Sequence, residues 1–376
     1  MKLSSLLIGV GVLGVLAAGI WYFTRPAPPP ADDPRVGQPV LATDGPADWA
    51  ALELAKDDGT RVRLEAGPHG WIVQESYPLP VDFPKLSRLI QSLQDMTVER
   101  FVTQQAERLE RLNLGQQSIT AFDAVGEAVF RLELGDTPSQ GGGYFATLGD
   151  EAAYRLSGNL WLDTLPNNWP DKTPIAWEID ELARATLATL DADAPLSLIA
   201  YVEGATSSWT LADGAEDSRL RVDEANSVLN TLRNLRYLEA RPAQDAEVVE
   251  AMSFAHTFRL EHTGGAQITV TIGRRPEMPA APDWLDATAL AMEPADVLDD
   301  KLTTDAPDDE PEMRPAGLVF ARYAFVGLDN DPWAAAVDGI AFELSSASFD
   351  RLLVSRDRLV ERVEPEAAGP TAGTGE

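Results

Sequence analysis

The sequence of 376 residues contains no cysteine and only three histidines. Without cysteine, disulfide bonds, thiol catalysis, cysteine-bound metals and lipid attachment through cysteine are excluded. Basic residues are scarce too, since 30 Lys and Arg stand against 60 Asp and Glu, a formal net charge of −30. Nucleic acid and anionic lipid surfaces both attract positively charged proteins, so we expect neither as a partner. The first interpretation of the acidity is a well-solvated surface.

Motifs of catalytic and cofactor sites are missing as well. No Gly-x-Ser-x-Gly elbow occurs, so a catalytic triad has no support. Glycines 141–143 are followed by Tyr144 and a strand pattern, which favours a hairpin loop over a phosphate-binding loop. The acidic pairs at 57–58 and at 191 and 193 lack the loop length and distal Glu of a calcium site, and turns explain them. We therefore expect no enzyme, no catalytic residue and no cofactor.

The three histidines do not form a metal-site pattern. His256 and His262 share the strand parity of Phe258 and point to one face, whereas Glu261 points to the other. His69 lies in a Gly-Pro turn far away along the chain. Metal sites usually show paired ligands at a short, fixed spacing, so structural or surface roles are favoured and no metal is expected.

The chain contains nine tryptophans. Trp71 and Trp209 each precede an amphipathic helix and are expected to anchor a strand against it. Five others lie in or beside Pro-rich or loop segments: Trp161, Trp169, Trp177, Trp284 and Trp333. Local packing is the first interpretation of these five, and a partner-binding surface is the second.

The N-terminus has the pattern of a membrane anchor. Residues 3–23 form an uncharged, mostly apolar run, long enough at about 1.5 Å per residue to cross a bilayer core of about 30 Å. Aromatic residues 21–23 and Arg25 close the run, as is typical of a membrane–water interface. The alternative is a signal peptide cleaved after small residues near 15–17. We expect an anchor over residues 1–24 and a stiff, Pro-rich spacer over residues 25–46.

One pattern occurs twice. After Trp71, apolar residues recur at the spacing of one helix face: Leu86, Leu89, Ile90, Leu93 and Met96. After Trp209 the same spacing holds for Ala225, Val228, Leu229, Leu232 and Leu235. Phe83 and Val222 precede the two patterns and are expected to pack back on the first turns. Two amphipathic helices introduced in the same way predict a duplicated domain.

Alternating apolar residues and turn signals predict antiparallel hairpins around each helix. The expected strands of the first half lie near residues 52–54, 62–64, 71–73, 119–122, 129–134, 144–148 and 153–156, with short helices over 105–112 and 159–165. In the second half we expect strands near residues 187–190, 196–202, 254–260, 268–272, 318–326 and 340–344, and a short helix over 348–353. Gly135 and Gly273 take matching places.

These elements predict an α+β fold of two tandem repeats, each with one main helix, behind a single transmembrane helix. The repeats are expected over residues 47–178 and 179–360. The second carries an insertion over 276–315, rich in Pro, Asp and Ala, which is interpreted as a mobile loop. Residues 361–376 are expected to be a disordered tail.

Several segments together resemble the bacterial domain-of-unknown-function 4340 family. The similarity lies in Trp71-Ile-Val, Pro80-Val-Asp82, Arg111-Leu-Asn-Leu-Gly115, Phe130-Arg-Leu-Glu-Leu-Gly135, Tyr144-Phe-Ala and Ala153-Tyr-Arg-Leu. The resemblance implies an N-terminal anchor and repeated α+β units. Some members are encoded beside ABC-type export or gliding-associated transport components, which implies an accessory role at the cell envelope. The family supplies no catalytic residues.

The leading hypothesis is a non-enzymatic accessory or scaffold protein, anchored once in the inner (cytoplasmic) membrane with its body in the periplasm. Its partners would be the membrane and an envelope protein, with ABC-type transporter components as the candidates. The alternative is a periplasmic module that binds a small envelope ligand or cell-wall component between the two repeats. A third class, a hydrolase with dispersed acidic residues, has less support.

The topology can be tested with a reporter that is active only in the cytoplasm, fused after Glu376. If the anchor is retained and the acidic body lies outside the cytoplasm, the reporter should be silent. Strong activity would contradict the orientation, and a mature protein that begins near Ala18 would contradict the anchor.

Overall fold

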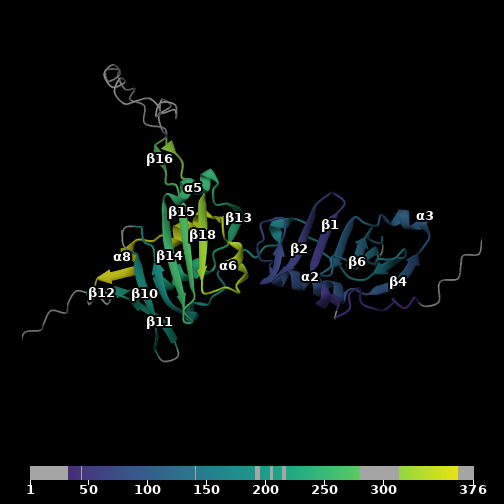
Figure 1. Cartoon of the computed structure of the whole chain (residues 1–376), viewed down its shortest axis with the longest axis horizontal. Coiled ribbons are helices and arrows are strands. Elements are labelled where there is room, and N and C mark those ends of the chain that lie inside the picture. The colour runs from purple at the N-terminus through teal and green to yellow at the C-terminus, as the bar shows by residue number, and fades with distance from the viewer. Residues whose placement is uncertain are drawn as a thin grey trace, which may run out of the picture. The chain divides into compact units, whose positions relative to one another are not determined.

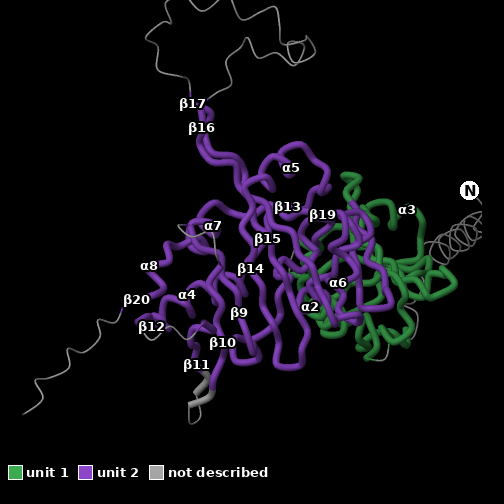
Figure 2. The backbone as a smooth tube through the Cα atoms, turned by 60° about the vertical axis from the view of Figure 1, so that its left-hand side comes forward, with its two compact units in different colours: residues 1–60, 87–162 green, residues 61–86, 163–376 purple. Residues whose placement is uncertain are grey.

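The computed structural model describes residues 33–43, 45–139, 141–190, 195–203, 206–213, 217–279 and 313–362. The chain forms two compact units, residues 1–60 with 87–162 and residues 61–86 with 163–376, shown in two colours in Figure 2. The architecture is mixed, with mostly antiparallel sheets and few helices (Figure 1). The expected anchor lies outside the described residues, among which no helix has the length and hydrophobicity to cross a bilayer.

The first sheet has eight strands in the order β3-β2-β1-β5-β6-β7-β8-β4. Its strands are β1 (Ala51–Lys56), β2 (Arg61–Gly67), β3 (Gly70–Val73), β4 (Val98–Thr103), β5 (Gln117–Phe122), β6 (Ala128–Leu134), β7 (Tyr144–Thr147) and β8 (Ala153–Leu156). Alternate residues are buried along them, as Leu52 and Leu54 in β1 and Ile119 and Ala121 in β5 show. This period of two gives the sheet one apolar face.

Helix α2 (Phe83–Asp95) supplies the other half of this core. Leu86, Leu89 and Leu93 are buried at the predicted helical spacing, and Met96 is buried just beyond the helix end. The predicted short helix over 105–112 forms as α3 (Ala106–Leu109) and the 3-10 turn η2 (Glu110–Leu112). A 3-10 turn, η1 (Gly45–Asp48), precedes β1.

The end of the expected spacer belongs to the folded part of the chain. The Gly37 N–H donates to the Val98 carbonyl at 2.8 Å, and the Val40 N–H donates to that of Met96 at 2.8 Å. Leu41 is buried, only 4% exposed. Residues 37–41 are therefore held against the end of α2 and the start of β4, because a buried Leu and strand-like backbone bonds fix them there.

The second sheet also has eight strands, in the order β11-β10-β9-β14-β15-β18-β19-β13. They are β9 (Leu182–Leu187), β10 (Leu196–Glu203), β11 (Thr206–Leu211), β13 (Tyr237–Pro242), β14 (Ala255–His262), β15 (Gln267–Arg274), β18 (Val319–Val326) and β19 (Ile340–Leu344). Two 3-10 turns, η3 (Pro166–Asn168) and η4 (Ile179–Glu181), lie before β9.

Helices cover both faces of the second sheet. On one face α4 (Val222–Arg233) buries Ala225, Val228, Leu229 and Leu232 in the main core. Helix α4 packs against α7 (Ser346–Leu352) and α8 (Arg356–Leu359). On the other face α5 (Ala246–Met252) forms a small cluster with Phe320 of β18. Helix α6 (Pro332–Ala336) buries Trp333 in the main core.

Two small ladders complete the second half. Strands β12 (Ser218–Leu220) and β20 (Val360–Arg362) pair with each other. Strands β16 (Met278–Pro279) and β17 (Met313–Arg314) pair at the base of the insertion. Arg275 is 6% exposed and donates from Nη2 to the Pro315 carbonyl at 2.7 Å. The base of the predicted mobile loop is thus part of the fold, and residues 280–312 lie outside the described residues.

The two large sheets have the same strand order. When the strands of each sheet are numbered 1 to 8 in chain order, the order across both sheets is 3-2-1-5-6-7-8-4. A glycine lies at the end of the sixth strand in each sheet: Gly135 directly follows β6, and Gly273 is the second-last residue of β15. A Cβ on Gly135 would come 2.2 Å from the Leu112 carbonyl oxygen, and a Cβ on Gly273 would come 2.3 Å from the Ala251 carbonyl oxygen. In both halves, a glycine is required because the end of a short helix approaches the strand closely.

Three local predictions were wrong. Phe83 is the first residue of α2 and is 65% exposed, so it does not pack back on the helix. Residues 159–165 form no helix, because burial of Leu160 and Leu162 alternates with exposure of Trp161, which is the pattern of an extended chain. The strand that we expected over 187–190 instead covers Leu182–Leu187, so most of it precedes the apolar run that suggested it.

Truncating the buried leucine of either main helix should destabilise the protein. Leu93 and Leu232 are fully buried, so Leu93→Ala and Leu232→Ala should each lower the free energy of unfolding by roughly 2–5 kcal/mol. The measurement is urea unfolding followed by tryptophan fluorescence. Leu238→Ala is the control, since that side chain is 58% exposed and its loss should have little effect. Equal stability of the control and the two core variants would contradict this packing.

Candidate functional site

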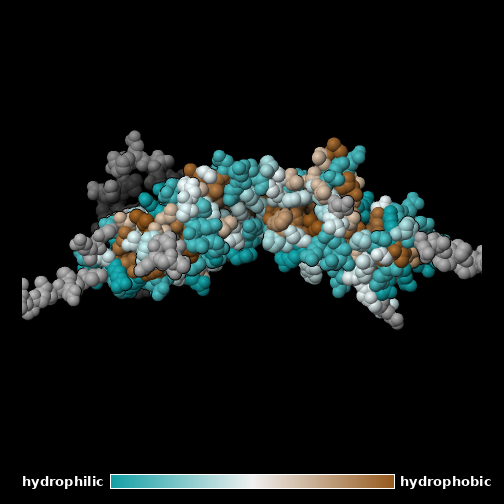
Figure 3. All heavy atoms as spheres, turned by 90° about the horizontal axis from the view of Figure 1, so that it is seen from below, coloured by the Kyte–Doolittle hydropathy of each residue, from teal (hydrophilic) through white to brown (hydrophobic). Residues whose placement is uncertain are grey.

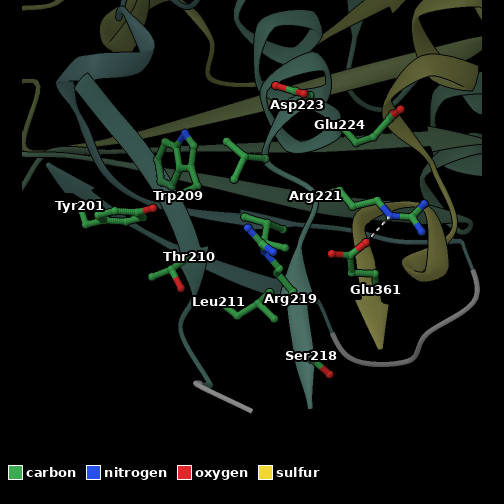
Figure 4. Close-up of a pocket in the computed structure, with 12 residues that line it drawn as sticks. Tyr201, Trp209, Thr210, Leu211, Ser218, Arg219, Arg221, Asp223, Glu224 and Glu361 are labelled. Carbon is green, nitrogen blue, oxygen red and sulfur yellow. Dashed lines mark ion pairs between the residues drawn. The ribbon is translucent and has the colours of Figure 1, made fainter. Parts of the chain in front are cut away.

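A groove with a volume of about 710 Å³ opens between strands β11 and β12 of the second half (Figure 4). Strands β10, β11, β12 and β20 and the first turn of α4 line it. In Figure 4, Tyr201, Trp209 and Thr210 lie on one side of the groove, and Arg221 and Glu361 lie on the other. The volume falls within the range of roughly 300–1,000 Å³ that is typical of ligand sites.

On the β11 side of the groove, some backbone groups have no hydrogen-bond partner among the described residues. Within these residues β11 is an edge of the second sheet and bonds only to β10. The Ala212 N–H donates to the Ser197 carbonyl at 2.9 Å, and these residues continue the β10–β11 register. Along an antiparallel ladder, every second residue forms backbone hydrogen bonds with the partner strand. Thr210, two residues before Ala212, therefore also bonds to β10. The N–H and C=O groups of Trp209 and Leu211 therefore face away from β10, towards the groove.

On the β12 side, too, some backbone groups have no hydrogen-bond partner among the described residues. The Arg221 N–H donates to the Leu359 carbonyl at 2.8 Å, in register with the β12–β20 pairing of Arg219 with Glu361. By the same alternation, the backbone groups of Ser218 and Leu220 point away from β20. No backbone hydrogen bond joins the described residues of β11 to those of β12.

In the first half, the corresponding edge is closed by the chain itself. The Val73 N–H donates to the Leu79 carbonyl at 3.0 Å, and the Val81 N–H donates to that of Trp71 at 2.8 Å. Ile72 pairs antiparallel with Pro80 between these bonds. The segment just before α2 thus adds a short strand to β3, whereas the segment just before α4 pairs with β20 instead of β11.

The remaining two sheet edges also receive bonds from neighbouring segments. At β4, the Val98 N–H donates to the Gln38 carbonyl at 2.9 Å. At β13, the Tyr237 N–H donates to the Lys172 carbonyl at 3.2 Å. Across the described ranges, β11 is therefore the sheet edge without a backbone bond from another segment of the chain.

Charged side chains of both signs surround the groove. The Arg221 Nε atom lies 3.7 Å from a Glu361 carboxylate oxygen, and the Arg358 Nε lies 2.9 Å from Glu224. Arg219 is exposed, and no ion pair joins it to another described residue. The residue at the same distance before α2 is the uncharged Pro80, so Arg219 is a positive charge beside the groove in a strongly acidic protein.

The three histidines lie apart from the groove. His256 packs edge-on against Phe349, with ring centroids 6.3 Å apart, and burial lowers the pKa of its imidazole. The His262 ring lies 5.2 Å from that of Trp177, and its Nδ1 accepts the Gly264 N–H at 2.8 Å. Within the described ranges, no cluster of three or more His, Asp or Glu residues has the geometry to hold a metal ion.

The other residues singled out in the sequence have structural places. Gly143 has φ of +80°, and a Cβ there would come 2.0 Å from the Leu156 carbonyl oxygen, so glycine is needed for the loop. Asp58 accepts the Thr60 N–H at 2.8 Å within the β1–β2 turn. The turn over 191–193 lies outside the described residues.

Tryptophans mainly pack, as predicted. Trp209 and Trp333 are buried in the second core, and Trp169 is buried with its Nε1 donating to the Asp163 carbonyl at 2.8 Å. Trp71 is half-buried, and Trp284 lies outside the described residues. Trp161 is 87% exposed. The face of the molecule in Figure 3 is largely hydrophilic, with scattered hydrophobic patches.

Sequence reasoning selected only Trp209 and Val222 among the groove residues, and it assigned both to packing. The available signal was the contrast between the segments before the two helices. Leu79-Pro80-Val81 has two residues suited to burial, whereas Ser218-Arg219-Leu220 has one. That contrast becomes informative only when the two segments are known to follow equivalent edge strands.

Comparison with known families agrees with the sequence. The model of a family described as a domain of unknown function (DUF4340) matches residues 71–251. The chain resembles DUF4340. The matched range runs from β3 to α5 and includes both main helices and the groove strands β10 to β12. No protein of curated function and no solved structure matches the chain.

Proposed function

We propose that the protein is a non-enzymatic accessory or scaffold protein, anchored once in the inner (cytoplasmic) membrane with its body in the periplasm. Its partner would be another envelope protein, with ABC-type transport components as the leading candidates. The apolar run over residues 3–23 supports the anchor. The similarity to DUF4340 supports the envelope role through what that resemblance implies.

The observation that carries this proposal is the edge of β11, whose outward backbone groups have no hydrogen-bond partner among the described residues. Exposed strand edges template pairing with other chains, and folded proteins usually cover or shorten them. This chain covers its other three sheet edges with its own backbone. A strand edge without backbone hydrogen bonds beside a groove supports a protein partner more than a reaction.

We also propose that the two halves arose by duplication of one unit. The shared strand order and the matched glycines 135 and 273 support this. In such a pair, a closed first half would serve as structural support. The second half would have gained a binding edge when a C-terminal strand, β20, drew β12 away from β11.

Co-purification tests the scaffold role directly. The full-length protein carrying a C-terminal tag should be extracted from membranes under detergent conditions that preserve transporter complexes. We expect other envelope membrane proteins, including transport components, in stoichiometric amounts. The control is a matched membrane protein with the same tag. Recovery of the protein alone, while transporter complexes in the same extract stay intact, would contradict the proposal.

A further inference from the structure

We infer that residues 33–41 form a strap that fixes the point where the membrane tether joins the first unit, residues 1–60 with 87–162, and so limits how far this unit stands from the bilayer. The inference rests on the proposed function, since it takes residues 3–23 as the anchor. The strap is held at its membrane end by four side chains, which we call the tyrosine clamp: Asp33, Arg35, Asp150 and Tyr154.

The tyrosine clamp joins the strap to strand β8 and to the turn before it. The Tyr154 hydroxyl lies 3.0 Å from Oδ2 of Asp150 and 3.1 Å from Oδ2 of Asp33. Arg35 donates from Nη1 to the same Asp150 oxygen at 2.7 Å, and its guanidinium lies 5.5 Å from the centre of the Tyr154 ring. Tyr154 is only 2% exposed, so the strap is attached to a side chain of the core.

The chemistry of the clamp requires both its hydroxyl and its arginine. Burial and the hydrogen bond to Asp150 raise the pKa of the Tyr154 hydroxyl, which therefore keeps its proton at neutral pH and remains a donor. One hydroxyl proton serves two carboxylates, those of Asp33 and Asp150. Arg35 supplies the positive charge that offsets one of these two negative charges.

The strap continues from the clamp along the edge of β4. The Val36 N–H donates to the Asp33 carbonyl at 3.0 Å, which closes a turn. Gly37 follows with φ of +84°, a conformation that side chains other than glycine rarely adopt. Beyond this turn Pro39 pairs antiparallel with Thr97, directly before β4. The clamp therefore lies at the end of the strap that faces the anchor along the chain.

The clamp shortens the tether between the bilayer and the first unit. Asp33 follows Phe23, the last residue of the apolar run, by ten positions, and this stretch spans at most about 35 Å at roughly 3.5 Å per residue. If the clamp opens, the first backbone bond to the body is the one from Gly37 to Val98. Four further residues then join the tether and add up to about 14 Å of reach.

The clamp also acts against electrostatic repulsion. Anionic lipid head groups repel a protein with a net charge of −30 within a Debye length, about 8 Å at physiological salt. Arg35 is the one basic residue between Arg25 and Lys56, and the clamp pairs it with Asp150. A short tether thus keeps an acidic body within reach of the membrane-embedded part of a partner.

Trypsin measures whether the clamp is closed. Arg35 is both a clamp residue and a cleavage site, whereas the bond after Arg25 resists trypsin because Pro26 follows it. In full-length protein reconstituted into nanodiscs, we expect Tyr154→Phe to release a body that begins at Val36 about three- to tenfold faster than wild type does. Cleavage follows the population of the open clamp, which grows when the hydroxyl is lost. Mass spectrometry identifies the released product.

Tyr144→Phe is the matched control for this comparison. The Tyr144 hydroxyl on β7 donates to the Leu160 carbonyl at 3.1 Å, so its loss also removes a hydrogen bond but leaves the clamp intact. Release should stay at the wild-type rate in this variant. Equal release rates of Tyr154→Phe and Tyr144→Phe would overturn the proposal. If trypsin degrades the body of Tyr154→Phe beyond the cut at Val36, the variant is unfolded and the distance measurement decides.

Energy transfer measures the distance from the bilayer, and the absence of cysteine allows a single label. Glu151→Cys places a donor on the exposed turn beside the clamp, with acceptors on the lipid head groups of the nanodisc. We expect lower transfer efficiency when Tyr154→Phe is combined with Arg35→Gln, since the longer tether lets the label stand up to about 14 Å farther away. Tyr144→Phe combined with Arg111→Gln, an exposed arginine outside the clamp, should match wild type. Equal efficiencies in the two double variants would overturn the proposal.

These results separate the strap from the scaffold role. If wild type inserts and recovers partners, but the clamp variants change neither release nor transfer, the strap falls and the scaffold role stands. If the clamp variants change both as expected, but tagged wild type recovers no partner, the scaffold role falls and the strap stands. Failure of wild type to insert into nanodiscs overturns both, because the anchor is their common premise.

Discussion

An open β-sheet must satisfy or hide the backbone groups along its two outer strands, and this constraint organises the whole molecule. Two eight-stranded sheets present four edges. Short segments outside the sheets bond to three of them, at β3, β4 and β13. Unpaired edges invite aggregation, so these segments protect the fold as well as complete it. Among the described residues, the edge at β11 is the exception, since only β10 bonds to its backbone.

The exception has a local cause. Before α2, Leu79 and Val81 are buried, and their burial holds the segment against β3. Before α4, the matching segment pairs with β20, whose position is fixed by the buried Leu359 of α8. Among the described residues of the first half, no strand equivalent to β20 pairs with the segment before α2. In the second half β12 thus pairs with β20 and not with β11, while the sheet order stays the same.

Much of the fold could be predicted, because it follows from local periodicity. The spacing of Leu86, Leu89 and Leu93 predicted a helix, and alternation predicted most strands. Predictions failed where a short apolar run fits two structures. Residues 159–165 contain enough apolar side chains for a helix, but burial on alternate positions makes them extended. The groove could not be predicted because it depends on which of two distant strands pairs with β12, and no local pattern encodes that choice.

The central claim is that the outward backbone groups of β11 have no hydrogen-bond partner among the described residues, where those of β3 are paired. Residue-resolved hydrogen exchange of the full-length protein measures this directly. The account predicts that the Trp209 and Leu211 amides exchange at least about tenfold faster than that of Thr210, which bonds to β10, while the equivalent Val73 amide is protected. Protection of the Leu211 amide equal to that of Thr210 would contradict the claim, because it would mean that the edge is already closed.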